Sequence, residues 1–300
     1  MSGWIVVLVC LGIVSGPLLA GIHAVWLRRL LGWFVLALAV AAAHFVLCEA
    51  PAFLRMVGIC CVLLAGMKGL VYAEWAAGSL PLSWGCYLVF ACLWFGMDPG
   101  TFRVRKAGLA WKGDLAVGGA LLLLGLAGAC GVALMGWCQV FIMFLPLSLA
   151  FHFGVLRMLK AALRCAGFPV RTLFPNLLLA HGFADFWSQR WNVGYSQMMQ
   201  RVVGRPIGAR CGRMGGLLAV FLISGLLHEL AITVPVRAGY GLPTLYFLCH
   251  GMLTLLEQKL GRPFGKVFVL AAVILPLGVL FPPEFQREIL EPCLAVFGKR

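Results

Sequence analysis

The sequence predicts an all-α integral membrane protein, a polytopic bundle of about nine transmembrane helices with re-entrant or interfacial helices. Of its 300 residues, 62% are hydrophobic and only 11% are charged, which leaves too little polar surface to cover a water-soluble domain. Apolar runs that approach the roughly 20 residues needed to cross a bilayer recur along the whole chain. We therefore expect one integral membrane domain that comprises residues 1–300.

Each predicted helix corresponds to an apolar segment that is long enough to span the membrane, or nearly so. These segments cover residues 4–22, 31–48, 53–74, 80–97, 114–135, 137–158, 214–235, 241–258 and 267–282. The first has no basic region before it and no small-residue cleavage site, so we expect a retained helix rather than a signal peptide. The domain is thus divided into N-terminal helices at 1–158, a long loop at 159–213 and C-terminal helices at 214–282.

Positive charges gather in the loops between the apolar segments. Lys and Arg outnumber Asp and Glu by 24 to 10, and the loops at 98–113, 157–213 and 259–266 hold 16 of the 24. The positive-inside rule assigns these loops, and with them the N-terminus, to the cytoplasm. This explanation favours membrane lipids rather than nucleic acid as partners, in a plasma (inner) membrane or the endoplasmic reticulum.

The twelve cysteines lie mostly within apolar runs and form no CxxC pair and no His/Cys cluster with zinc spacing. We expect them to pack as small hydrophobic residues, without disulfides, a metal site or a bound cofactor. Two basic residues in a predicted span, Arg55 and Lys68, are expected to snorkel or to pair with Glu49 and Glu74, with a role in a transport pathway as the alternative.

The long basic loop is expected to contain a re-entrant or interfacial segment that leads into a helix. Pro169, Pro175 and the apolar stretch 173–183 precede a region, 185–203, in which aromatic and apolar residues recur at helical spacing. Polar residues fall on a neighbouring face of the same predicted helix. The apolar face carries Trp187, Trp191, Tyr195, Met198 and Val202, and the polar face carries Asp185, Ser188, Asn192 and Ser196.

The next apolar helix carries His228 and Glu229 in its interior. An ionisable group at the bilayer centre costs about 2.5–3.5 kcal/mol, so such residues usually mark a pathway or a reaction site. Imidazole has an ordinary pKa of about 6.5 and can act as a base near neutral pH. The alternative is a packing histidine bonded to a backbone carbonyl or to a polar residue of another helix.

Glu229 is expected to be structural, because neighbouring helix positions diverge by about 100° and both side chains cannot point at one reacting atom. It could instead pair with a loop arginine. HExxH zinc binding is excluded because position 232 is Ile.

The segment DFWSQRWN at 185–192 is followed, 36 residues after Asn192, by the histidine of SGLLHE. This pairing resembles the wax synthase branch of the membrane-bound O-acyltransferases (MBOATs), in which a motif of the type F-Y-x-D-W-W-N precedes the helix of a catalytic histidine. In this chain Gln189 replaces the Asp and Arg190 the first Trp, a departure typical of that branch. The resemblance is close over residues 165–260. The matching residues are Phe186, Trp187, Trp191 and Asn192.

The resemblance implies an MBOAT-like fold and transfer of an acyl group from acyl-CoA, a co-substrate, to a hydroxyl acceptor, with a long-chain fatty alcohol first among the acceptors. His228 would be the general base. Asn192 would hold the thioester or tetrahedral oxyanion, a role in which one donor contributes about 3–4 kcal/mol. The predicted substrate-binding residues are Asp185, Trp187, Gln189, Arg190, Trp191, Ser224, Glu229 and His250.

Simpler roles remain open for several of these residues. The two tryptophans, Trp187 and Trp191, could be membrane-interface anchors. Arg190 could contact anionic lipid, and Asn192 could be an interfacial helix residue that binds water.

Two other functions compete with this one. The acceptor could be a small metabolite, a terpenoid, another lipid or a glycan. A different class is a transporter whose intramembrane His, Glu and Lys conduct ions or protons. Transporters commonly contain internal repeats with paired broken helices, and no second copy of SGLLHE or FWSQRWN occurs in the first half of this chain. The enzyme is therefore the favoured class.

Overall fold

The computed structural model describes residues 2–135 and 140–292, and this part of the chain consists of helices and connecting loops without a strand. The prediction of an all-helical protein is confirmed. The chain forms two compact units, one made of residues 1–103 with 197–220 and the other of residues 104–196 with 221–300. The helical segment α10 (Arg205–Val236), which is kinked at Gly212 with φ 75° and ψ 170°, contributes to both.

Six helical stretches in the described residues are long and apolar enough to cross a membrane, and a seventh is obtained if the bent run from Lys266 to Leu290 counts as one span. The chain is therefore an integral membrane protein. The number is smaller than the nine segments predicted. One reason is that the helix in the predicted span 80–97, α4 (Trp84–Leu93), has ten residues, or about 15 Å of helix, half of a hydrocarbon core. Another is a bend of 75° at the end of the last predicted span.

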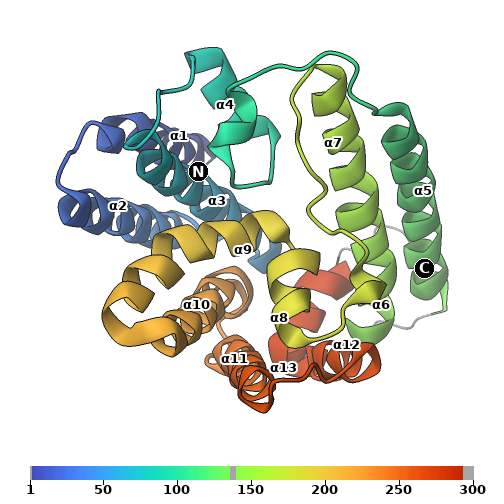
Figure 1. The fold of residues 1–300 in the computed structure, drawn as a ribbon. Coiled ribbons are helices and arrows are strands. Elements are labelled where there is room, and N and C mark those ends of the chain that lie inside the picture. The colour runs from blue at the N-terminus through green and yellow to red at the C-terminus, as the bar shows by residue number, and fades with distance from the viewer. Residues whose placement is uncertain (1, 136–139, 293–300) are drawn as a thin grey trace. The chain divides into compact units, whose positions relative to one another are not determined.

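The first unit is built on three helices that lie side by side (Figure 1): α1 (Ser2–Ala20), α2 (Val25–Val46) and α3 (Ala52–Ala76). Glycines allow α1 and α3 to touch along their backbones. A Cβ atom at Gly12 would lie 2.8 Å from the Gly66 nitrogen, closer than side chains can approach. Small residues at such positions are a common way for membrane helices to associate. α4 and the short η1 (Pro99–Phe102) pack beside α3 in the same unit.

Buried charges in the first unit are paired differently from the prediction. The carboxylate of Glu74 binds Arg28 at 3.4 Å and Arg29 at 2.9 Å. Lys68 is fully buried, and its Nζ donates to the carbonyls of Phe90, at 2.9 Å, and Gly96, at 2.6 Å. The expectation that Lys68 snorkels or pairs with a glutamate is wrong, because the end of α4 and the following loop supply carbonyl oxygens directly at its ammonium group.

Glu74→Gln is expected to destabilise the protein by about 3–5 kcal/mol, because it leaves the buried guanidinium of Arg28 without its carboxylate. Thermal unfolding of the purified protein in one detergent measures this change. Glu284→Gln is the matched control: its partner Arg287 is 64% exposed, so the expected loss is below about 1 kcal/mol. Equal effects of the two substitutions would contradict the prediction.

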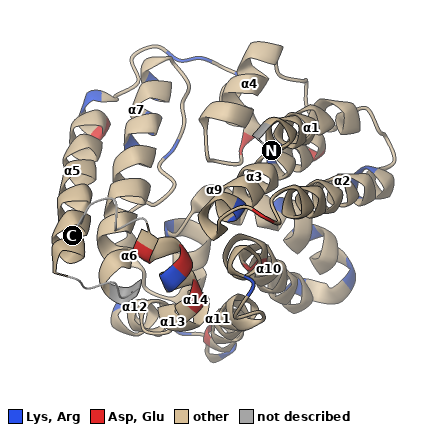
Figure 2. Ribbon diagram, turned by 180° about the vertical axis from the view of Figure 1, so that it is seen from behind, with Lys and Arg blue, Asp and Glu red and all other residues tan. Residues whose placement is uncertain are grey.

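The second unit begins with α5 (Lys112–Leu134), which packs against one continuous helical run. This run consists of α6 (Val140–Ser148), the π-helical η2 (Leu149–Val155) and α7 (Leu156–Cys165). A Cβ atom at Gly125 of α5 would lie 2.5 Å from the Ala150 nitrogen, so the two backbones are in contact. Asp114, at the start of α5, binds Arg157 at 3.0 Å and Lys160 at 2.8 Å. Elsewhere Figure 2 shows long uncharged stretches of helix, as expected for helices in lipid.

The region 185–203 is not the single interfacial helix that its periodicity predicted. The chain forms the short α8 (Phe183–Asp185) and η4 (Phe186–Arg190), breaks at Trp191 and Asn192, and starts again with α9 (Val193–Met199). Trp191 is extended, with φ −102° and ψ 118°, and Asn192 is left-handed, with φ 42°. The remaining elements are η3 (Leu177–Leu179), η5 (Gln200–Gly204), α11 (Leu242–Leu260), α12 (Lys266–Ile274), α13 (Leu277–Leu280), α14 (Pro283–Phe285) and η6 (Gln286–Leu290).

Candidate active site

The candidate residues lie in the second unit, where one face of α10 meets α11 and the segment from α8 to α9. Phe221, Ser224 and His228 follow one another at helical spacing on this face. Trp187 of η4 packs edge-to-face on Phe221, with 6.0 Å between ring centroids. Phe247 of α11 lies over the His228 ring at 4.2 Å. The fold thus brings His228 and the 185–192 motif to one face of one helix.

Two glycines allow α10 and α11 to approach closely enough for this packing. A Cβ atom at Gly225 would lie 2.6 Å from the Thr244 Cα, and one at Gly251 would lie 3.0 Å from the Phe221 Cβ. A side chain at Gly225 would push the helices apart, and one at Gly251 would crowd the Phe221 side chain. Gly225, beside Ser224, therefore helps to bring Phe247 of α11 into contact with the imidazole of His228.

His228 is partly buried and has a defined tautomer. Its Nδ1 lies 2.6 Å from the Ser224 carbonyl oxygen, which can only accept a hydrogen bond, so Nδ1 carries the proton. In the neutral ring Nε2 then holds the lone pair, and it has no hydrogen-bond partner among the described residues. The bond of the simpler alternative, a histidine held by a backbone carbonyl, is present, but it uses only one of the two nitrogens.

His250 differs from His228 in this respect. Its ring is 2% exposed, with Nδ1 at 2.9 Å from the Tyr246 carbonyl and Nε2 at 3.2 Å from the Ala272 carbonyl. Both nitrogens therefore face backbone acceptors. The centroid of the His250 ring lies 5.3 Å from that of Trp187. His250 therefore supports the packing of the site and does not offer a free lone pair.

Glu229 is held by the start of α11 rather than by a loop arginine. Its Oε1 accepts hydrogen bonds from the Gly241 nitrogen at 3.0 Å, the Thr244 nitrogen at 3.0 Å and the Thr244 hydroxyl at 2.8 Å. Its Oε2 accepts from the hydroxyl of Thr233. The N-terminus of a helix has unpaired N–H groups and a partial positive charge, so a carboxylate is stable there. The expectation that Glu229 is structural agrees with this geometry.

Asn192 lies in the break after η4, immediately before the first residue of α9. Its Oδ1 accepts from the Tyr195 nitrogen at 3.2 Å, which is the bond of a helix N-cap. The following residue, Val193, donates its N–H to the Leu173 carbonyl at 2.9 Å. Within the described part of the chain the Asn192 amide nitrogen has no partner. Its two N–H groups therefore remain able to donate to a ligand.

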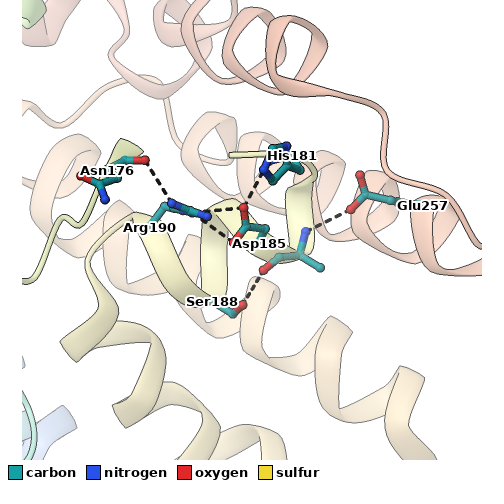
Figure 3. A network of polar contacts seen from close by, with 7 residues as sticks. Asn176, His181, Asp185, Ser188, Arg190 and Glu257 are labelled. Atoms are coloured by element: carbon teal, nitrogen blue, oxygen red, sulfur yellow. Dashed lines mark hydrogen bonds and ion pairs between the residues drawn. The ribbon is translucent and has the colours of Figure 1, made fainter. Parts of the chain in front are cut away.

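Charged and polar groups around η4 form the network in Figure 3, which holds the shape of residues 181–190. Asp185 binds Arg190 at 3.1 Å and accepts from the His181 nitrogen at 3.1 Å. Arg190 also donates to the Asn176 carbonyl at 3.3 Å. Glu257 of α11 accepts from the Ala184 nitrogen at 3.1 Å. The carboxyl and guanidinium groups predicted to bind substrate are thus engaged within the protein, while Gln189 is exposed.

The two tryptophans pack inside the second unit rather than facing outward as interface anchors. Trp187 lies among Phe186, Phe221, Phe247 and His250, and its buried Nε1 has no hydrogen-bond partner. Trp191 packs on aromatic rings of the neighbouring helical run, of the loop after it and of η4, namely Phe144, His152, Phe174 and Phe186.

Beside Trp191 lies a small cavity lined by residues of η2, α7 and the loop after α7, including His152, Lys160 and Thr172. Its volume of about 30 Å³ is enough to hold water. Lys160 is already bound to Thr172 at 2.7 Å and to Asp114 at 2.8 Å.

Residues 170–249 match the family model "Membrane bound O-acyl transferase family". This segment contains both DFWSQRWN and SGLLHE. The chain resembles the membrane-bound O-acyltransferases, in their wax synthase-like branch. The prediction made from the two motifs is confirmed.

Curated relatives support the same branch. The chain is 31% identical over 153 residues to a probable long-chain-alcohol O-fatty-acyltransferase 2 of Arabidopsis thaliana, an alignment that covers 43% of this chain and 45% of the relative. It is 29% identical over 134 residues to a long-chain-alcohol O-fatty-acyltransferase of Simmondsia chinensis, with 38% of each chain covered. The chain therefore spans less than half the length of the curated relatives it matches.

Three residues at the MBOAT-like site were not predicted to belong to it: Tyr195, Phe221 and Phe247. Tyr195 lay on the predicted aromatic face, and this was the one signal that pointed to it. The phenylalanines gave no signal, because apolar aromatic residues are common throughout membrane helices.

Glu229→Ala is expected to lower stability by about 1–3 kcal/mol, because the N–H groups of Gly241 and Thr244 at the start of α11 lose their hydrogen bonds to a charged acceptor. Hydrogen exchange measured by mass spectrometry should be faster in peptides that contain Gly241 and Thr244. Glu229→Gln, which keeps one oxygen acceptor, should give a smaller change. Unaltered protection of these peptides in Glu229→Ala would contradict the role given to Glu229.

Proposed function

We propose that the protein is an O-acyltransferase that moves a fatty acyl group from acyl-CoA to the hydroxyl of a long-chain alcohol. The family match and the names of the relatives support the reaction and the acceptor class. The observation on which the mechanism depends is the unpartnered Nε2 of His228, whose tautomer is fixed by the Ser224 carbonyl at 2.6 Å.

In the proposed reaction, Nε2 of His228 takes the proton of the alcohol as the alcohol oxygen attacks the thioester carbonyl carbon. The resulting imidazolium keeps its Nδ1 bond to the Ser224 carbonyl. The tetrahedral intermediate then collapses, the carbon–sulfur bond breaks, and the leaving thiolate receives the proton from Nε2. The products are the ester and free coenzyme A, and no acyl group is attached to the protein.

Asn192 is the proposed donor to the oxygen that becomes negative in this intermediate. The two polar atoms of its side chain have different roles. Oδ1 caps α9, at 3.2 Å from the Tyr195 nitrogen, and the amide nitrogen remains available to donate to the oxyanion. Preorganised donors of this kind are worth most where water is excluded. Because Oδ1 is held by the helix, the direction of the N–H groups is fixed before the substrate binds.

The acyl chain and the alcohol are both apolar, so a site among membrane helices can receive them from the bilayer. The membrane is proposed to be the plasma (inner) membrane or the endoplasmic reticulum, with the basic loops in the cytoplasm.

His228→Ala should reduce turnover roughly 100- to 10,000-fold, the usual contribution of a general base. The measurement is release of free thiol by the purified protein with a series of acyl-CoAs and alcohols. The matched control is His44→Gln, a partly buried histidine of α2 in the other unit, which should retain turnover close to that of the parent. Normal turnover in His228→Ala would refute the assignment of the base.

Asn192→Asp separates donation from capping. Aspartate caps helices as well as asparagine does and tolerates the left-handed backbone, but its carboxylate has no N–H to donate. Turnover should therefore fall roughly 100- to 1,000-fold while the unfolding temperature stays close to that of the parent. Asn192→Gly, which fits the positive φ but removes the whole side chain, should show a comparable loss. If Asn192→Asp were fully active, Asn192 would be a helix cap and nothing more.

A further inference from the structure

We infer that Tyr195 is a positioning residue that holds the two proposed reactive groups, the amide of Asn192 and the imidazole of His228, in register. This inference rests on the proposed function. Hydrogen bonds of Tyr195 connect the break before α9 to the face of α10 that carries Ser224 and His228. The connection has three bonds, and each of them ends on an identified atom.

The first bond joins Tyr195 to Asn192. The Tyr195 backbone nitrogen donates to Asn192 Oδ1 at 3.2 Å, which fixes the asparagine rotamer as well as the first turn of α9. The same turn is closed by the Ser196 nitrogen, which donates to the Asn192 carbonyl at 3.0 Å. A shift of Tyr195 therefore moves the Asn192 amide with it.

The other two bonds join Tyr195 to His228 by way of Ser224. The Tyr195 hydroxyl donates to Ser224 Oγ at 3.1 Å. Ser224 is 4% exposed, and its carbonyl accepts from His228 Nδ1 at 2.6 Å. The Tyr195 ring also meets the imidazole edge-to-face, with centroids 6.3 Å apart and an angle of 79°. Tyr195 thus anchors α9 to the residue that sets the tautomer of His228.

No other described residue makes both connections. Phe247 contacts the imidazole at 4.2 Å but has no polar atom with which to fix a register. Tyr195 therefore acts on the separation of donor and base and not on the affinity for either substrate. Loss of its hydroxyl should lower kcat and leave KM unchanged, since small misplacements of reacting groups are expensive.

Tyr195→Phe tests the inference in the full-length protein. We expect kcat for thiol release to fall roughly 10- to 100-fold with KM constant. If the effect passes through Ser224, the double variant Tyr195→Phe/Ser224→Ala should be no slower than Ser224→Ala alone. Additive losses would refute the route through Ser224.

Tyr246→Phe is the matched control. The Tyr246 hydroxyl is also buried and donates to the Val273 carbonyl at 2.8 Å, but it has no bond to Ser224 or His228. It should lower thermal stability about as much as Tyr195→Phe while keeping kcat. An equal fall of kcat in both variants would indicate general loosening of the helices and would overturn the inference.

A second measurement does not depend on turnover. Nitrogen-15 NMR of protein labelled at histidine reports the tautomer, and the His228 signals are identified by their loss in His228→Gln. The parent should show a protonated Nδ1 and a bare Nε2, and Tyr195→Phe should mix the two tautomers. A changed spectrum in a protein that turns over no acyl-CoA would refute the proposed function and keep the positioning role. An unchanged spectrum would refute that role.

Discussion

Polar groups among membrane helices have little water to bind, so the protein itself must supply most of their hydrogen-bond partners. Among the described residues, Glu229, Glu257 and Lys68 find such partners in backbone atoms. Glu229 accepts from the first N–H groups of α11, and Glu257 accepts from the start of α8. Lys68 donates to two carbonyls beyond its own helix. Charged side chains thus fasten helix ends and loops, and the bonds of Glu229 and Glu257 help to shape the candidate site.

The same constraint distinguishes the two histidines near the site. His250 has a carbonyl at each nitrogen, while His228 has one at Nδ1 only. The difference does not come from burial alone. It arises because α12 supplies the Ala272 carbonyl to one ring, whereas an aromatic ring, Phe247, covers the other. A base needs an open lone pair, so packing selects which histidine can serve.

Sequence reasoning found the helical fold, the membrane location and the two motifs, because each depends on composition or on local order along the chain. Periodicity failed at Trp191 and Asn192, where the spacing of apolar residues continued through a break. The cap at Asn192 and the bond from Val193 to the Leu173 carbonyl outweigh that periodicity. The short α4 was missed for a related reason, since an apolar run does not specify where its helix ends.

By itself the sequence determined that apolar helices carry a histidine, a glutamate and an asparagine in two motifs typical of MBOATs. It could not assign their partners, because hydrogen bonds between residues such as Tyr195 and Ser224, 29 positions apart, have no local pattern. The tertiary structure decided that Glu229 caps α11, that Asp185 forms an ion pair with Arg190 and that Nε2 of His228 has no hydrogen-bond partner among the described residues. The physical reason is that the role of a polar group in a dry interior depends on its hydrogen-bond partners. Segments that are distant along the chain supply these partners.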